Sequence, residues 1–331
     1  MKKRILAVLI ATALAVSVTG CAGNATSSSD STSASSVAES SDTSTQTSAD
    51  ASSEDESKDE SSQEESKDLE ANYTKYTLDG DLTQHMIDMS RLNEGNKVRL
   101  ANVIKKLKNG EEVTVGFIGG SITQGTSAGN DLCYAKLTAD WLQKTYSNAK
   151  INYVNAGIGA TGSYIGVHRV ANDLLSKNPD LVFVEFSVND TTENTERNKK
   201  SYDGLLRTIW KSSTNPAIIT IATTQEDGTS FQDQHAEIVK HYDLPMISYR
   251  NTILDTIKHG DIVWKDISDD NIHPNVPGHK IVSQLLQAYI SDVDKDVDNI
   301  SGSESDFTTP ATDAPIENGS LIQPSSATDV T

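Results

Sequence analysis

The stretch VTVGFIGGSIT, residues 113–123, joins a run of apolar residues to a glycine pair and a serine. Its first six residues are rich in β-branched and aromatic side chains and predict a short buried strand. Gly119 and Gly120 follow this strand, and Ser121 comes next. Glycines at such a point let the chain turn sharply and expose the serine hydroxyl at the edge of a sheet. The stretch therefore predicts a strand followed by a serine whose hydroxyl is exposed and available to react.

Four similar apolar runs follow, and amphipathic helical patterns separate them. Strands that alternate with helices indicate a parallel sheet covered by helices on both faces. We therefore expect a three-layer α/β/α domain with a five-stranded parallel sheet. The expected strands are 113–118, 151–155, 181–186, 217–222 and 245–249, and the expected helices are 86–108, 132–146, 164–176, 199–212, 232–241 and 277–290.

Polar residues follow the ends of these strands, where functional groups collect in an open parallel sheet. A serine hydroxyl is a weak nucleophile at neutral pH and needs a neighbouring base. His273 is a suitable base for Ser121, and Asp270 can turn back to fix the tautomer of the imidazole. The blocks that carry these residues and their neighbours are GGSIT at 119–123, NAGIGATG at 155–162, SVND at 187–190 and DNIHP at 270–274.

The same blocks supply hydrogen-bond donors for a developing oxyanion. Asn189 offers a side-chain N–H, and Ser121 and the loop of Gly159 and Ala160 offer backbone N–H groups. If the five predicted strands, numbered along the chain, lie in the order 2-1-3-4-5 across the sheet, the loops after the second and third strands both border Ser121. Ala160 suits this role only if it avoids positive φ, so Gly159 is the alternative donor.

In this order, GGSIT, NAGIGATGS, SVND and DNIHP resemble the four blocks of the SGNH (GDSL-type) hydrolase superfamily. The resemblance spans nearly all of the predicted domain and favours the GGSIT-type, carbohydrate-esterase-like subgroup, because Gly120 stands where the namesake motif has Asp. It implies a flavodoxin-like fold that needs no cofactor or metal. It also implies Ser121 as nucleophile, His273 as base, Asp270 as the partner of that base and Asn189 as an oxyanion donor.

Each block alone has a simpler interpretation. Ser121 after two glycines also fits a helix N-cap or an anion-binding turn. Asn189 and Asp190 fit the cap of a turn, and Asp270 with His273 fits a pair of metal ligands, although the sequence shows no third ligand cluster. The four blocks together, all placed at strand ends, favour a catalytic site.

Trp264 precedes Asp270 by six residues and has two interpretations. It is either an aromatic platform for a sugar ring or a buried core residue. Cys133 is expected to be a small core residue, and Asp190 with Arg169 is a possible charge pair. The remaining histidines are expected to pack, cap helices or contact solvent: His85, His168, His235, His241, His259 and His279.

The charge of the chain is uneven. The 331 residues include 47 acidic and 28 basic side chains, a net charge of −19 that argues against a nucleic-acid partner. Residues 24–70 carry a net charge of −11, residues 292–331 carry −8 and residues 1–23 carry +3, which leaves −3 for residues 71–291. The acidity therefore belongs to the ends of the chain.

The first residues have the pattern of an export signal. Three basic residues precede a short apolar run that ends before Cys21. The run is shorter than the ~20 residues that a membrane-spanning helix needs. Cys21 after Val18-Thr19-Gly20 resembles a bacterial lipobox, which implies a lipidated cysteine and a protein anchored to the outer face of a membrane.

Composition then divides the chain into four parts. Residues 1–20 are the predicted signal peptide, and residues 21–70, rich in Ser, Thr, Asp and Glu, are a predicted disordered tether. Residues 71–298 form the predicted hydrolase domain. Residues 299–331 are a predicted disordered acidic tail, either a plain end or a linker to a further domain.

These observations predict an exported, lipid-anchored serine esterase that works through an acyl-enzyme. The expected substrate is an O-acetylated carbohydrate polymer, by analogy with the subgroup and from the expected location, because fold alone does not fix function. The alternatives are a lipase or thioesterase of the same superfamily, an O-acyltransferase, and a non-catalytic surface binding module.

Overall fold

The computed structural model describes residues 73–191, 194–317 and 319–320. The predicted signal peptide, Cys21 and the tether lie outside these described residues. Within the described part of the chain, no helix combines the length and apolar character needed to cross a membrane.

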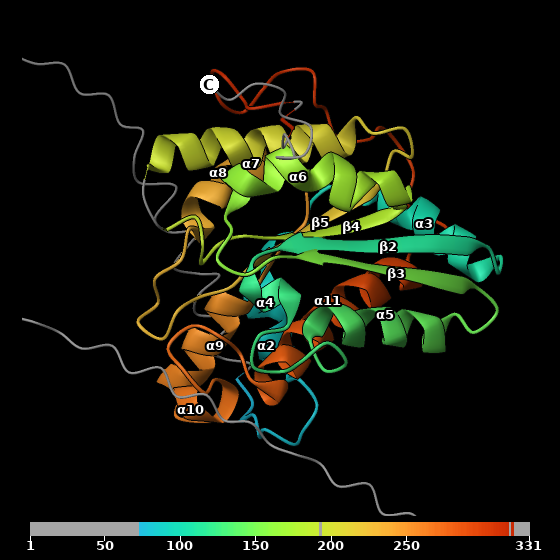
Figure 1. Ribbon diagram of the computed structural model, residues 1–331. Coiled ribbons are helices and arrows are strands. Elements are labelled where there is room, and N and C mark those ends of the chain that lie inside the picture. Colours follow the sequence, from blue (N-terminus) through green and yellow to red (C-terminus); the bar gives the residue numbers. More distant parts are fainter. Residues whose placement is uncertain (1–72, 192–193, 318, 321–331) are drawn as a thin grey trace, which may run out of the picture. The chain divides into compact units, whose positions relative to one another are not determined.

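Six strands form one sheet in the order β1-β6-β5-β4-β2-β3 (Figure 1). The five strands from β2 to β6 are parallel to one another and correspond to the five predicted from the sequence. Their order is the expected 2-1-3-4-5, and β1 adds a sixth strand that pairs antiparallel with β6 at the edge. The strands are β1 (Arg91–Asn93), β2 (Glu112–Gly119), β3 (Lys150–Gly157), β4 (Leu181–Glu185), β5 (Ala217–Ala222) and β6 (Met246–Ser248).

Helices cover both faces of the sheet, which confirms the three-layer α/β/α class (Figure 1). One face packs against α6 (Ser163–Asp173), α7 (Thr195–Trp210) and α8 (Gln232–His241). The other packs against α3 (Val98–Lys108), α5 (Tyr134–Thr145) and α11 (Val276–Lys295). The shorter elements are α2 (Gln84–Ser90), α4 (Ser121–Gln124), η1 (Leu175–Lys177), α9 (Tyr249–Lys258) and α10 (Trp264–Ile267).

Alternate residues of each central strand enter opposite layers, as the pleat requires. Phe117 of β2 and Phe183 of β4 stack with ring centroids 4.6 Å apart in the layer of α5 and α11. Ile118 and Val184, one position along, are buried in the layer of α6 and α7. Burial on both faces explains why the strands are continuous apolar runs.

The helix predicted over residues 86–108 is wrong, because the chain breaks into α2, β1 and α3. Gly95 lies between β1 and α3 with φ of +62°, a conformation that ends a right-handed helix. A Cβ at this position would lie 2.2 Å from the backbone nitrogen of Pro245. The close approach of the chain just before β6 therefore sets the break.

Part of the segment predicted to be a disordered tail packs against the domain. Phe307 is only 6% exposed and stacks on Tyr242 and Trp210 with centroid separations of 3.9 and 4.5 Å. Farther along, Glu317 forms an ion pair with Arg207 of α7. The prediction failed here because a few residues, such as Phe307 and Glu317, anchor a segment whose composition is otherwise that of a solvated tail.

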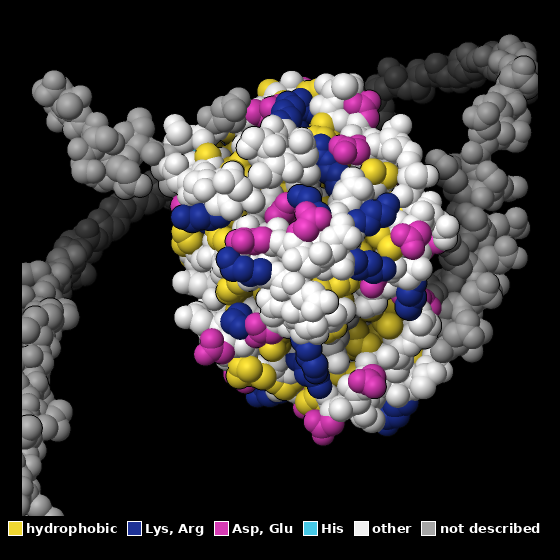
Figure 2. All heavy atoms as spheres, turned by 90° about the vertical axis from the view of Figure 1, so that its right-hand side faces the viewer, with side chains coloured by type: hydrophobic (Ala, Val, Ile, Leu, Met, Phe, Trp, Pro, Cys, Tyr) yellow, Lys and Arg dark blue, Asp and Glu magenta, His cyan; other side chains and the backbone are white. Residues whose placement is uncertain are grey.

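The face at the amino ends of the strands carries charges of both signs (Figure 2). Lys106 pairs with Asp180 at 2.8 Å, and Lys150 pairs with Glu112 at 3.0 Å. Exposed pairs of this kind contribute little to stability. Their mixture fits the near-neutral charge of the predicted domain.

We expect Phe307→Ala to lower the free energy of unfolding by about 3 kcal/mol, because it removes a buried aromatic side chain. Urea unfolding followed by tryptophan fluorescence measures this loss, with the exposed Ser301→Ala as the matched control. Equal midpoints for the two variants would show that the segment does not stabilise the domain.

Candidate active site

Three residues far apart in the sequence form a hydrogen-bonded chain at the carboxyl ends of the strands. Ser121 begins α4 directly after β2, and its Oγ lies 2.9 Å from Nε2 of His273. Nδ1 of His273 lies 2.8 Å from Oδ2 of Asp270. The structure thus brings together the predicted nucleophile, base and partner of the base.

This geometry sets the proton positions in the resting site. Asp270 accepts from Nδ1–H of His273, so Nε2 is left to accept the Ser121 hydroxyl proton. Burial alone would raise the pKa of Asp270, but hydrogen bonds from the backbone and ring of His273 and from the Ile272 N–H hold that pKa below its usual range. Asp270 therefore stays ionised and can stabilise an imidazolium.

The loop that carries Asp270 and His273 is braced from inside. The buried Ser268 places its Oγ 2.8 Å from the carbonyl oxygen of Asp270 and 2.6 Å from that of His273. Trp264 donates its indole N–H to the Asp270 carbonyl at 2.6 Å. Sequence reasoning missed Ser268, because a lone serine before an acidic pair carries no signal of this role.

Trp264 is therefore a buried support for this loop, and its interpretation as a sugar platform is wrong. Its side chain is 7% exposed and belongs to the core cluster with α11. A stacking platform needs an open aromatic face, which this residue does not offer.

Gly119 and Gly120 are needed because a side chain at either position would collide with a neighbouring residue, and neither glycine has a positive φ. A Cβ on Gly119 would lie 2.0 Å from Oγ1 of Thr123. A Cβ on Gly120 would lie 2.0 Å from Oδ1 of Asn189. The carboxamide of Asn189 thus lies against the backbone that leads into Ser121, where a side chain at position 120 would displace it.

The loop after β3 supplies the remaining predicted oxyanion donors. Gly159 donates its N–H to Oε1 of Gln124 at 2.9 Å, and a Cβ on Gly159 would lie 3.9 Å from Cβ of Ser121. Ala160 is exposed and has φ of +58°, the conformation that its predicted role had to avoid. The backbone angle of Ala160 disfavours it as the donor, and the Gly159 N–H would have to leave Gln124 to reach an oxyanion. Gln124, which the sequence did not single out, contacts this loop through its side-chain oxygen.

Comparison with known proteins bears on the fold of this chain. The model of the GDSL-like Lipase/Acylhydrolase family matches residues 117–281, from β2 to α11. A two-domain esterase active on acetylated mannans is 38% identical and superposes with a TM-score of 0.65. The chain has the SGNH hydrolase fold.

The similarity to the mannan esterase covers 68% of this chain and 61% of that one, so this chain spans less than two thirds of its relative. The same esterase was also crystallised with mannopentaose, and that structure matches with a TM-score of 0.64. A catalytic mutant of an acetylxylan esterase from Geobacillus stearothermophilus is 18% identical over 54% of this chain and 94% of that one, with a TM-score of 0.47. A comparison with curated protein sequences gives no match.

In this SGNH-type fold, a buried arginine ties two strand ends together. Arg169 of α6 donates to the carbonyl oxygen of Ala156 at 2.5 Å and to that of Gly119 at 2.9 Å. Its ion pair is with Asp173 on the same helix, at 3.3 Å. The possible charge pair of Arg169 with Asp190 is therefore not formed.

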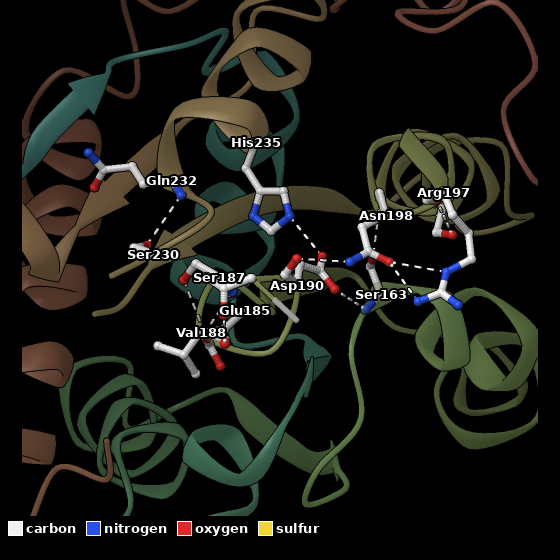
Figure 3. Close-up of polar contacts among 12 residues, drawn as sticks. Ser163, Glu185, Ser187, Val188, Asp190, Arg197, Asn198, Ser230, Gln232 and His235 are labelled. Carbon is white, nitrogen blue, oxygen red and sulfur yellow. Dashed lines mark hydrogen bonds and ion pairs between the residues drawn. The ribbon is translucent and has the colours of Figure 1, made fainter. Parts of the chain in front are cut away.

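A buried carboxyl group lies at the end of β4. Oε1 of Glu185 accepts from the N–H and Oγ of Ser187 and from Oγ1 of Thr223, at 3.1, 3.2 and 2.7 Å (Figure 3). Burial raises the pKa of Glu185 to about 7, although these hydrogen bonds oppose the shift. Glu185 thus fixes the start of the loop that carries Asn189.

The remaining predicted residues have structural roles. His279 accepts from the Tyr134 N–H at 3.1 Å, and burial lowers the pKa of this histidine to about 4, which keeps it neutral. Cys133 is buried at the N-cap of α5.

One group among the described residues could offer three ligand atoms to a metal ion, namely His85, Asp255 and His259, between α2 and the end of α9.

We expect Trp264→Phe to lower kcat about tenfold, because it removes one hydrogen bond from the Asp270 carbonyl but keeps an aromatic ring. KM should change little. Steady-state kinetics on a p-nitrophenyl ester measure both constants, with Trp141→Phe as the control. Unchanged kcat with a raised KM would instead favour a role in substrate binding.

Glu185→Gln should remove a pH dependence of stability. With a folded pKa near 7 and an ordinary value of 4.5, the native state of the wild type holds a proton that the unfolded state has lost between these pH values. The wild type therefore loses stability as pH rises from 4.5 to 7, by about 3 kcal/mol in all.

Urea unfolding at pH 5 and pH 8 tests this, with the exposed Glu111→Gln as control. Relative to the wild type, Glu185→Gln should gain stability at pH 8. Parallel pH profiles for the wild type and Glu185→Gln would contradict the prediction.

Proposed function

We propose that this protein is a serine esterase that removes O-acetyl groups from a carbohydrate polymer. The observation that carries the proposal is the continuous hydrogen-bonded chain from Ser121 through His273 to Asp270, next to Asn189 and Gly159. Such a chain activates a serine for attack on an ester carbonyl.

The proposed reaction has two halves. Nε2 of His273 takes the hydroxyl proton as Oγ of Ser121 bonds to the carbonyl carbon, and the oxyanion accepts hydrogen bonds from Asn189, Gly159 and the Ser121 N–H. The bond between the acetyl carbon and the sugar oxygen then breaks, and His273 gives its proton to that oxygen, which leaves as a hydroxyl. Water, activated by His273, attacks the acetyl-enzyme and releases acetate, which restores Ser121.

A cavity next to Gln124 has both polar and apolar walls, and we take its polar groups as support for a carbohydrate substrate. It has a volume of about 310 Å³ and is lined by Gln124, Asn130, Tyr153, Asn155 and Gly157. Amide and phenol groups suit sugar hydroxyls, whereas a long acyl chain needs an apolar channel. The relative active on acetylated mannans supports the same substrate class, and we extend it to this chain as part of the proposal.

We also propose that the protein is exported and lipid-anchored through Cys21 to the outer face of a bacterial membrane. The support is the signal-like start of the chain and the cysteine that follows it. Substrates of an enzyme held in that position would be polymers outside the cell.

Acetate release from acetylated mannan and acetylated xylan tests the function. The wild type should release acetate, and Ser121→Ala should lose activity by at least about 10⁴-fold, because the nucleophile is absent. Ser176→Ala, on the surface of the same domain, is the control.

The alternatives give different results in the same assays. Faster hydrolysis of long-chain than of short-chain p-nitrophenyl esters would indicate a lipase or thioesterase. Acetylated sugar in acceptor-rich medium would indicate an acyltransferase. Polysaccharide binding without turnover, unchanged in Ser121→Ala, would indicate a binding module.

A further inference from the structure

Asn189 lies in a short turn whose geometry determines where its carboxamide points. The N–H groups of Asn189 and Asp190 both donate to the carbonyl oxygen of Phe186, at 3.1 and 3.0 Å. The carboxamide meets the backbone at Gly120, next to Ser121. A small rotation of this turn would move the amide away from the reacting carbonyl, so the turn must be held from behind.

Asp190 is the residue that holds this turn (Figure 3). Its side chain is 1% exposed, and its Oδ1 accepts from the Ser163 N–H at 2.8 Å at the start of α6. Its own carbonyl oxygen accepts from Nδ2 of Asn198 on α7 at 2.8 Å. A Cβ on Gly162 would lie 2.5 Å from Oδ1 of Asp190, so a glycine is needed there.

The second carboxylate oxygen of Asp190 meets a histidine that the esterase mechanism does not use. Nε2 of His235 lies 2.9 Å from Oδ2 of Asp190, and the His235 side chain is fully buried (Figure 3). The imidazole stacks on Tyr202 with centroids 3.6 Å apart and meets the edge of Phe231 at 5.2 Å. These contacts leave the ring little freedom to rotate.

The tautomer of His235 follows from its surroundings. Within residues 73–191 and 194–317, Nδ1 of this buried ring has no hydrogen-bond partner. A proton on Nδ1 would be buried without an acceptor, so the proton lies on Nε2 and is donated to Asp190. The N-cap residue of α8 also contacts this loop, because the Phe231 N–H donates to the Ser187 carbonyl oxygen at 2.8 Å.

We propose that His235 is a positioning residue for the oxyanion donor, acting through Asp190 on Asn189. The helix α8 thereby fixes the angle of the Asn189 carboxamide without touching the substrate. This inference rests on the proposed esterase function and assigns a further role to a residue that was expected only to pack, cap a helix or contact solvent.

Two substitutions separate the hydrogen bond from the packing of His235. His235→Phe keeps a ring on Tyr202 but removes the donor, and His235→Gln keeps an amide N–H near the position of Nε2 but removes the ring. With p-nitrophenyl acetate, His235→Phe should lower kcat by about tenfold to hundredfold with little change in KM, because a misplaced group near the reacting centre has effects of that size. His235→Gln should recover most of this loss.

The decisive measurement repeats His235→Phe in an Asn189→Ala background. Removal of one oxyanion donor should itself lower kcat about hundredfold or more. If His235 acts through Asn189, His235→Phe should then lower kcat by no more than about twofold further, because residues that act as a unit are not additive. The rate of Ser121 labelling by a fluorophosphonate should follow the same pattern, and thermal unfolding should show that each variant is folded.

Each outcome has a distinct meaning. An equal loss from His235→Phe in both backgrounds, or a larger loss in His235→Gln than in His235→Phe, would overturn the positioning role and leave the esterase function standing. A wild-type protein that neither hydrolyses the ester nor reacts with the fluorophosphonate would overturn the proposed function, and this inference with it.

Discussion

The parallel pairing of β2 with both β3 and β4 is the constraint on which the site depends. Gly119 lies opposite Gly157 on one side and opposite Glu185 on the other, so three strands end at the same level. The chain leaves β2 toward β3 and returns past it to β4, which opens a crevice at the point of reversal. Arg169 fixes two of these strand ends by hydrogen bonds to their carbonyl oxygens.

Buried polar groups hold the loop that follows β4, and with it the side chain of Asn189, in one position at these strand ends. Glu185 and Asp190 lie on either side of Asn189 in the sequence. The carboxyl group of Glu185 accepts from Ser187 and Thr223, and that of Asp190 accepts from Ser163 and His235. Such networks hold one geometry well only when their members are paired, because an unpaired buried polar group is costly. The catalytic loops therefore draw their order from residues that never meet a substrate.

The sequence predicted most of the sheet and the residues of the site, for identifiable reasons. Strands buried on both faces are continuous apolar runs, and glycine, serine and asparagine at strand ends are local signals. The errors at Gly95 and Phe307 share one cause, because each depends on a contact with a distant part of the chain, Pro245 for Gly95 and Tyr242 for Phe307. The choice between Gly159 and Ala160 and the role of Trp264 were left open by the sequence.

The triad combines one local pair with one very distant pair. Asp270 and His273 are three residues apart and share a braced loop, whereas His273 and Ser121 are 152 residues apart. The acid–base pair can therefore persist in any partly folded state that keeps α10 and the loop, but the serine gains its base only after this segment has docked on the sheet. The proposed activity therefore depends on this contact across 152 residues as well as on the strands of the sheet.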